Sequence, residues 1–177
     1  DKFLQYCEEY KLPMNKKIKE FSTGMKRKLQ IFAAITHKAK LLLLDEPTSG
    51  LDVVAREQML TLLREYMETE GRAILISSHL SGDLETFCDD IYLIQKGTIT
   101  FHEEMDRLLD AYGLLKVSEE VYKKMDKSHI ICQKKENFGW SCLTDQKAYY
   151  QMHNPEIVIE KGSVDELILL MAGGEKI

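Results

Sequence analysis

The sequence predicts an α/β fold, with a parallel sheet flanked by helices and a small α+β extension at the C-terminal end. Short, uniformly apolar runs alternate with helical patterns along the N-terminal part of the chain, an order typical of layered α/β proteins. After Tyr112-Gly113 the pattern changes to short strand and helix candidates. We therefore expect a domain at 1–111, a hinge at Tyr112-Gly113 and an extension at 112–177.

The predicted elements of the first domain begin with a short helix and a break at Leu12-Pro13. Ser22 is a plausible N-cap for a helix that runs to about His37, and Asp52 for one over about 53–70 that ends at Gly71. Two apolar runs, 41–44 and 73–76, predict strands buried on both faces, as in a parallel sheet. A helix from Ser81 to Cys88, a hairpin of 91–94 and 98–101 about Lys96-Gly97, and a helix at 103–111 follow.

The extension is predicted from weaker signals. Its strand candidates are 114–117, 129–134 and 156–160, and its helix candidates are 118–125 and 163–171. Trp140 is expected in its core.

Composition excludes several classes of protein. The 177 residues carry 24 basic and 29 acidic side chains, a formal charge of −5, which argues against a general nucleic-acid binder. The longest apolar runs fall far short of the roughly 20 residues that a membrane helix needs. Four cysteines without zinc spacing predict reduced thiols in a cytosolic protein.

Acidic side chains end the first predicted strand. Asp45 and Glu46 follow the run 41–44, at the strand end where open α/β sheets bind ligands. Because side chains alternate along a strand, one carboxylate can hold a hard cation such as Mg²⁺ while the other addresses a water. His79 follows the run 73–76 and is expected at the same rim. Taken alone, the acid pair is equally consistent with idle surface groups, and a single histidine is more often an ordinary surface or core residue.

Ser22 and Gly24 stand where a helix begins. Free N–H groups and the positive end of the helix dipole make that position suitable for phosphate, and Gly24 permits close backbone approach. Most capped helices bind nothing, so this signal is weak alone.

Together, three segments resemble the ATP-binding subunit of ABC transporters. They are FSTGMKRKL at 21–29, LLLLDEPTSGLD at 41–52 and SSH at 77–79. The first is similar to the signature motif, with Thr23 and Met25 as departures that are typical of drug, antibiotic or bacteriocin exporters of the ABC-2 type. The second is similar to the Walker B strand and D-loop, and the third to the switch histidine.

The resemblance implies a P-loop NTPase-like fold and ATP hydrolysis with Mg²⁺. Asp45 would hold Mg²⁺, Glu46 would polarise the attacking water, and His79 would contact the γ-phosphate. Phosphoryl transfer needs this positioning and charge stabilisation more than covalent help.

The resemblance also implies partners. In this family two subunits enclose two ATPs, so Ser22 and Gly24 would contact the ATP held by a second ABC ATP-binding subunit, and Asp52 would act across that interface. A transmembrane permease is the other expected partner, and the expected location is cytoplasmic, peripheral on the inner face of the cell membrane.

A Walker A loop is missing, because none of the ten glycines is followed by lysine. We therefore interpret the chain as the C-terminal part of a nucleotide-binding domain, inactive alone, with an uncovered sheet edge that favours self-association. Two alternatives remain: an ABC-type ATPase without a membrane partner, and a non-catalytic interaction module.

Overall fold

The computed structural model describes residues 1–176, which form two compact units divided between Asp83 and Leu84. The expected hinge at Tyr112-Gly113 therefore lies inside the second unit, and each unit is described separately. None of the helices in this described range is long and apolar enough to cross a bilayer.

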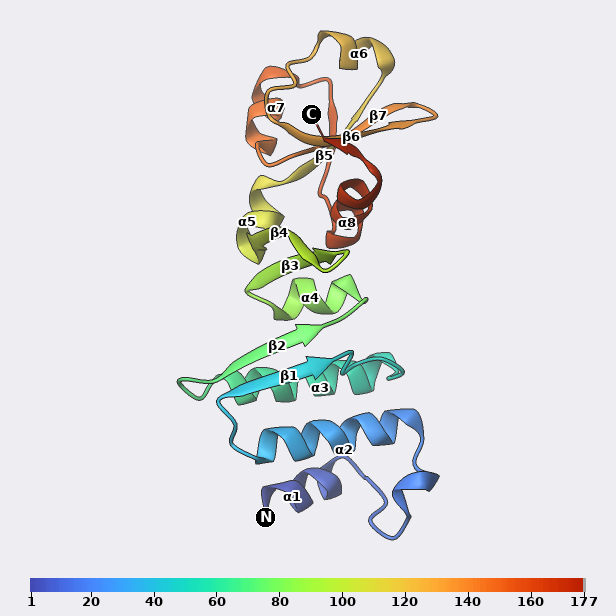
Figure 1. Ribbon diagram of the computed structural model, residues 1–177, viewed down its shortest axis with the longest axis vertical. Helices are drawn as coiled ribbons and strands as arrows, with labels where there is room; N and C mark the ends of the chain where they lie inside the picture. Colours follow the sequence, from blue (N-terminus) through green and yellow to red (C-terminus); the bar gives the residue numbers. More distant parts are fainter. Residues whose placement is uncertain (177) are drawn as a thin grey trace. The chain divides into compact units, whose positions relative to one another are not determined.

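The N-terminal unit has the predicted order of elements (Figure 1). These are α1 (Lys2–Glu9), the short 3₁₀ helix η1 (Ile18–Glu20), α2 (Thr23–Thr36), β1 (Leu41–Asp45), α3 (Val53–Met67) and β2 (Ala73–Ser77). The helix α4 (Ser81–Phe87) spans the boundary between the units.

Both predicted helix caps are confirmed. The Ser22 hydroxyl accepts a hydrogen bond from the Met25 N–H at 3.2 Å, and the Asp52 carboxylate accepts one from the Ala55 N–H at 2.8 Å. Each cap satisfies a backbone donor that has no partner within the helix. The two caps therefore fix where α2 and α3 begin.

Strands β1 and β2 pair in parallel, as predicted. Leu43 lies opposite Leu75 and Asp45 opposite Ser77, so both strands end at the same edge. The Tyr66 hydroxyl of α3 donates to the carbonyl of Ala39 just before β1, which joins this helix to the start of the strand.

The expectation that these strands are buried on both faces is wrong. Leu42 is 5% exposed, but Leu41, Leu43 and Leu75 are 54%, 70% and 61% exposed. Paired residues of a sheet share a face, so these three leucines lie on one side of it. A uniformly apolar strand is buried twice only where elements cover both sides, and in the described unit only one side is covered.

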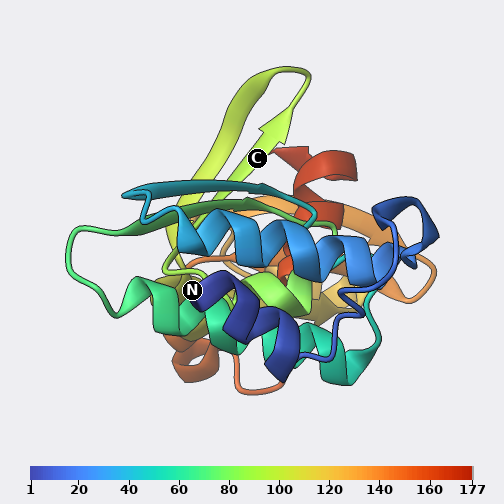
Figure 2. The same ribbon diagram turned by 90° about the horizontal axis from the view of Figure 1, so that it is seen from below.

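The covered side belongs to a core shared with the helices. Figures 1 and 2 show α1 beside α2, where the rings of Tyr6 and Tyr10 lie 5.6 and 5.1 Å from that of Phe32. The helix α3 buries apolar side chains along one face, among them Met59, Leu60, Leu63 and Tyr66.

The second unit begins with the predicted hairpin and continues as a sheet protein. Its elements are β3 (Asp90–Gln95), β4 (Thr98–Glu104), α5 (Met105–Ala111), β5 (Gly113–Val117), α6 (Glu119–Lys124), β6 (Ile130–Glu136), β7 (Gly139–Thr144), α7 (Lys147–His153), β8 (Val158–Glu160), α8 (Val164–Gly173) and β9 (Glu175–Lys176). The strands β3 and β4 are antiparallel, and Lys96 and Gly97 make the turn with positive φ.

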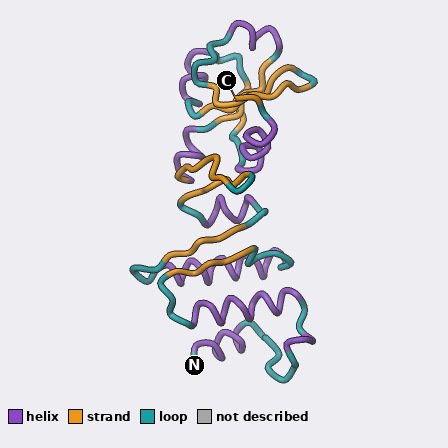
Figure 3. The backbone as a smooth tube through the Cα atoms, in the orientation of Figure 1, coloured by secondary structure: helices purple, strands orange, loops and turns teal. Residues whose placement is uncertain are grey.

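Five strands of this unit form one antiparallel sheet in the order β8-β5-β7-β6-β9. Strands are drawn in orange in Figure 3. Leu114 and Leu115, neighbours on β5, belong to two separate apolar clusters, as expected where successive side chains point to opposite faces. The predicted strands and helices of the extension are present, but β7, α7 and β9 were not predicted from the sequence.

Tyr112 is a core residue and not part of an exposed linker. It packs in one apolar cluster with Leu108 of α5 and Leu114 of β5, and its hydroxyl donates to Glu103 at 2.9 Å. The predicted hinge is therefore replaced by continuous packing.

The four cysteines and Trp140 are all buried or half-buried. The four cysteines form no disulfide in the described part of the chain, and burial raises the pKa of Cys88 to about 11 and that of Cys142 to about 12, so both stay protonated at neutral pH. Trp140 is half-buried: its ring stacks on Tyr122 at 4.3 Å and its N–H donates to Glu119.

We predict that the chain self-associates through the β1–β2 sheet. Among the described residues each strand has one neighbour, which leaves two free edges beside an exposed apolar face. The variant with Leu43→Glu and Leu75→Glu should shift the molecule toward monomer in size-exclusion chromatography with light scattering. Leu169→Glu, at an exposed leucine of α8, is the control and should leave the mass unchanged. A monomeric wild type at all concentrations would contradict the prediction.

Candidate functional site

The acid pair stands at the carboxyl end of β1. Asp45 ends the strand, and its carboxylate accepts a hydrogen bond from the Ser77 hydroxyl of β2 at 2.5 Å. Glu46 follows with φ of +48°, a left-handed conformation that turns the chain sharply away from the strand. The two neighbouring carboxylates contact different partners: Asp45 contacts Ser77 and Glu46 contacts His79.

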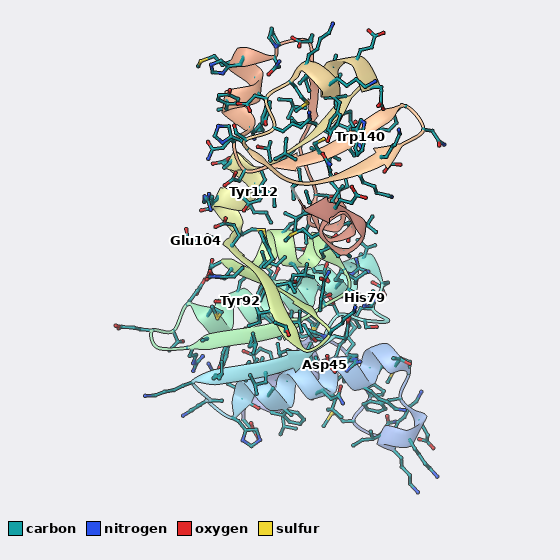
Figure 4. The ribbon with its side chains drawn as sticks, turned by 45° about the horizontal axis from the view of Figure 1, so that its top comes forward. Asp45, His79, Tyr92, Glu104, Tyr112 and Trp140 are labelled. Carbon is teal, nitrogen blue, oxygen red and sulfur yellow. The ribbon has the colours of Figure 1, made fainter. Side chains whose placement is uncertain are left out.

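His79 comes to this acid pair from the loop after β2. Its Nδ1 lies 2.6 Å from a carboxylate oxygen of Glu46, and the Glu46 N–H donates to the carbonyl of Ser77 at 3.0 Å. A carboxylate can only accept, so the Nδ1 of His79 carries the proton and Nε2 is left free to address a ligand. The structure thus brings His79 into contact with Glu46, the residue after Asp45, as the sequence placed these three at one rim. Figure 4 labels Asp45 and His79.

A second group forms around the turn between β1 and α3. Gly50 has φ of +76°, and a Cβ added to it would lie 3.3 Å from the Thr23 side chain. A Cβ on Gly24 would in turn lie 3.3 Å from Leu51. The N-terminus of α2, with Ser22 and Gly24, therefore lies against the turn that leads to Asp52. These three residues therefore belong to one group around this turn.

The donors present suit a hydrated cation better than a closed metal cage. No cluster of three or more His, Cys, Asp or Glu side chains able to hold a metal occurs in the described part of the chain. Asp45 offers one carboxylate, already hydrogen-bonded to Ser77. This fits Mg²⁺, which keeps several waters and is commonly completed by phosphate oxygens.

Sequence analysis assigned no role to Ser77, Thr48 or Asp83. Ser77 was quoted only as part of the segment before His79, yet it bonds directly to Asp45. Thr48 and Asp83 bond to one another beneath the turns that carry Glu46 and His79. A polar residue directly opposite the acid in a parallel register could have pointed to Ser77, whereas the Thr48–Asp83 contact had no signal in the sequence.

The sequence of the chain is similar to those of known proteins. Residues 15–82 match a family model described as an AAA domain, whose description also names the AbiEii toxin and a type IV TA system. The chain is 45% identical over 83 residues to the ABC transporter ATP-binding protein YdbJ of Bacillus subtilis, which covers 47% of this chain and 27% of that protein. It is 38% identical over 89 residues to the lantibiotic transport ATP-binding protein SrtF of Streptococcus pyogenes, covering 50% of this chain and 38% of SrtF.

The fold is likewise similar to solved structures. An ATP-binding subunit of an ABC transporter superposes with a TM-score of 0.55 and 28% identity, covering 60% of this chain and 45% of that one. The homologues of this chain are therefore ATP-binding proteins of ABC transporters, and its α/β fold is that of ABC ATPase domains. The chain spans about a quarter to two fifths of the length of these two curated relatives.

We predict that Asp52 stabilises this region as a helix cap. Asp52→Ala removes the acceptor for the Ala55 N–H and should lower the free energy of unfolding by about 1 kcal/mol, measured by urea denaturation. Asp52→Asn is the matched control: it keeps a capping oxygen and should be close to the wild type. Equal losses in the two variants would mean that the charge, not the cap, is what matters.

Proposed function

We propose that this chain supplies the catalytic acids of an ATP-binding and ATP-hydrolysing subunit that powers an ABC transporter. The observation that carries the proposal is the contact of Glu46 with His79 beside Asp45, at the carboxyl end of a parallel strand pair. Its support from homology is that the relatives are named as transporter ATP-binding proteins.

The proposed roles follow from the chemistry of each side chain. Bound Mg²⁺ would neutralise charge on the phosphates, and Asp45 would hold it through water. Glu46 would orient and polarise the attacking water, since its carboxylate has an acceptor oxygen besides the one that His79 occupies. His79 would donate a hydrogen bond from its other ring nitrogen to the γ-phosphate, which requires the doubly protonated ring while Nδ1–H is held by Glu46.

We propose that Ser22, Gly24 and Asp52 act on a second ABC ATP-binding subunit. Ser22 and the start of α2 offer hydroxyl and N–H donors to phosphate, and the Asp52 turn lies beside them.

The remaining proposals concern the partner, the direction of transport, the location and the domain organisation of the protein. A transmembrane permease is the proposed partner, export the proposed direction, and the cytoplasmic face of the cell membrane the proposed location. The Thr23 and Met25 departures in the signature segment and the name of SrtF support transport of this kind. We also propose that 1–111 contributes to the ATP-binding domain and 112–177 is an extension of it.

We predict that the chain by itself does not bind ATP tightly. Its sequence has no glycine followed by lysine, so the loop that cradles phosphates in this class is missing from the 177 residues. Isothermal titration of the chain with Mg-ATP should give no binding in the micromolar range and no hydrolysis. Micromolar affinity would contradict this prediction.

Catalysis can be tested in a chimera. Residues 1–105 would replace the homologous stretch of YdbJ, and ATP turnover of the purified protein would be measured. We expect turnover, and Glu46→Gln should lower kcat by about 10²-fold or more, because water loses its polarising carboxylate.

The control for the chimera is Glu57→Gln, an exposed glutamate of α3 that lies outside the site. Its turnover should match that of the unmodified chimera. A folded chimera in which the Glu46 variant hydrolyses ATP at the unmodified rate would refute the proposed role.

A further inference from the structure

A buried carboxylate lies behind the exposed contact of Glu46 with His79. Asp83, in α4, is 6% exposed, and its Oδ2 accepts a hydrogen bond from the Thr48 hydroxyl at 2.7 Å. Thr48 itself is fully buried. A polar pair removed from water is costly unless its hydrogen bond is made, so this contact is strongly held in place.

Arg56 adds a charge to this pair. Its guanidinium Nη1 lies 3.9 Å from Oδ1 of Asp83. In the described part of the chain, the Nε of Arg56 is buried without a hydrogen-bond partner. Asp83 therefore joins a residue of the turn after β1, through Thr48, to the first turns of α3, through Arg56.

The positions of Thr48 and Asp83 along the chain place their hydrogen bond between the two turns of the candidate site. Thr48 stands two residues after Glu46, and Asp83 stands four residues after His79. The Asp83 N–H also donates to the carbonyl of Leu80 at 3.1 Å, which ties its backbone to the residue after His79. The Thr48–Asp83 bond thus joins the two turns that carry the two functional side chains.

Glu46 and His79 cannot hold this arrangement by their own contact alone. Their side chains are 29% and 65% exposed, and exposed ion pairs contribute little because water competes and rotamer freedom is lost. Glu46 also has positive φ, which is unfavourable for a residue with a Cβ and persists only where its surroundings impose it. The buried bond between Thr48 and Asp83 is a fixed contact of the kind that the exposed pair of Glu46 and His79 does not provide.

We infer that Asp83 is a positioning residue, which holds Glu46 and His79 in hydrogen-bonding distance through its buried bond with Thr48. The inference rests on the proposed function only for its meaning in catalysis. Its test uses no nucleotide, so it can fail while the proposed ATPase role stands, and the reverse.

The test reads the imidazole of His79 directly. Long-range ¹H–¹⁵N spectra of the ¹⁵N-labelled chain show which ring nitrogen carries the proton, and His79→Gln identifies the signal. The spectra would be taken at about pH 8, above the ordinary histidine pKa of about 6.5. In the wild type the proton should be on Nδ1, held by Glu46, and Glu46→Ala gives the spectrum of the broken pair.

Two pairs of variants separate positioning from stability. Asp83→Ala and Thr48→Val, which remove the acceptor or the donor of the buried bond, should lose the Nδ1–H signal and give the spectrum of the Glu46→Ala variant. Asp83→Asn and Thr48→Ser, which keep an acceptor oxygen and the hydroxyl, should retain it. Asp90→Ala is the matched control, because Asp90 pairs with His102 at 2.9 Å on an exposed hairpin. It should alter the His102 signal alone.

Backbone spectra and thermal unfolding would show that each variant is folded. A folded Asp83→Ala or Thr48→Val chain with the wild-type His79 spectrum would overturn the inference. Loss of the signal in Thr48→Ser to the same extent as in Thr48→Val would also overturn it, because the hydroxyl would then be irrelevant. If Asp83→Ala does not fold, the two Thr48 variants decide.

Discussion

The parallel pairing of β1 with β2 is the constraint on which the candidate site depends. Its register sets Asp45 opposite Ser77, and the Glu46 N–H extends the ladder by one bond to the Ser77 carbonyl. Parallel strands end at the same edge of a sheet, so the residues that follow the two strands lie close to one another. A slip of one residue would turn every side chain to the opposite face and separate the acid pair from His79.

Around this edge, left-handed backbone conformations and buried polar contacts together position the residues of the site. Positive φ at Glu46 and Gly50 folds the segment after β1 back on itself, and Asp52 then starts α3. The turn lies against the start of α2, where a side chain larger than that of Gly24 would crowd Leu51. The exposed residues of the site can therefore be polar and solvated, while the atoms that position them are out of water.

Sequence analysis succeeded where the signal is local. Caps at Ser22 and Asp52 and the turn at Lys96-Gly97 depend on residues a few positions apart, and all are present in the structure. It failed at β7, a central strand that buries Ser141 and Thr144 among apolar residues and so shows no clear alternation. Burial of the leucine runs was misjudged because cover on a second face is not encoded in the strand itself.

By itself the sequence determined which chemistry the chain carries: the acids after one strand, the histidine after the next, and the segments similar to ABC ATP-binding subunits. Only the tertiary structure decided how these groups meet, because distances between residues thirty or more positions apart depend on register and packing. The 2.6 Å contact of Glu46 with His79 and the buried bond of Thr48 with Asp83 are of this kind. So is the packing of Tyr112, which local composition had suggested was a hinge.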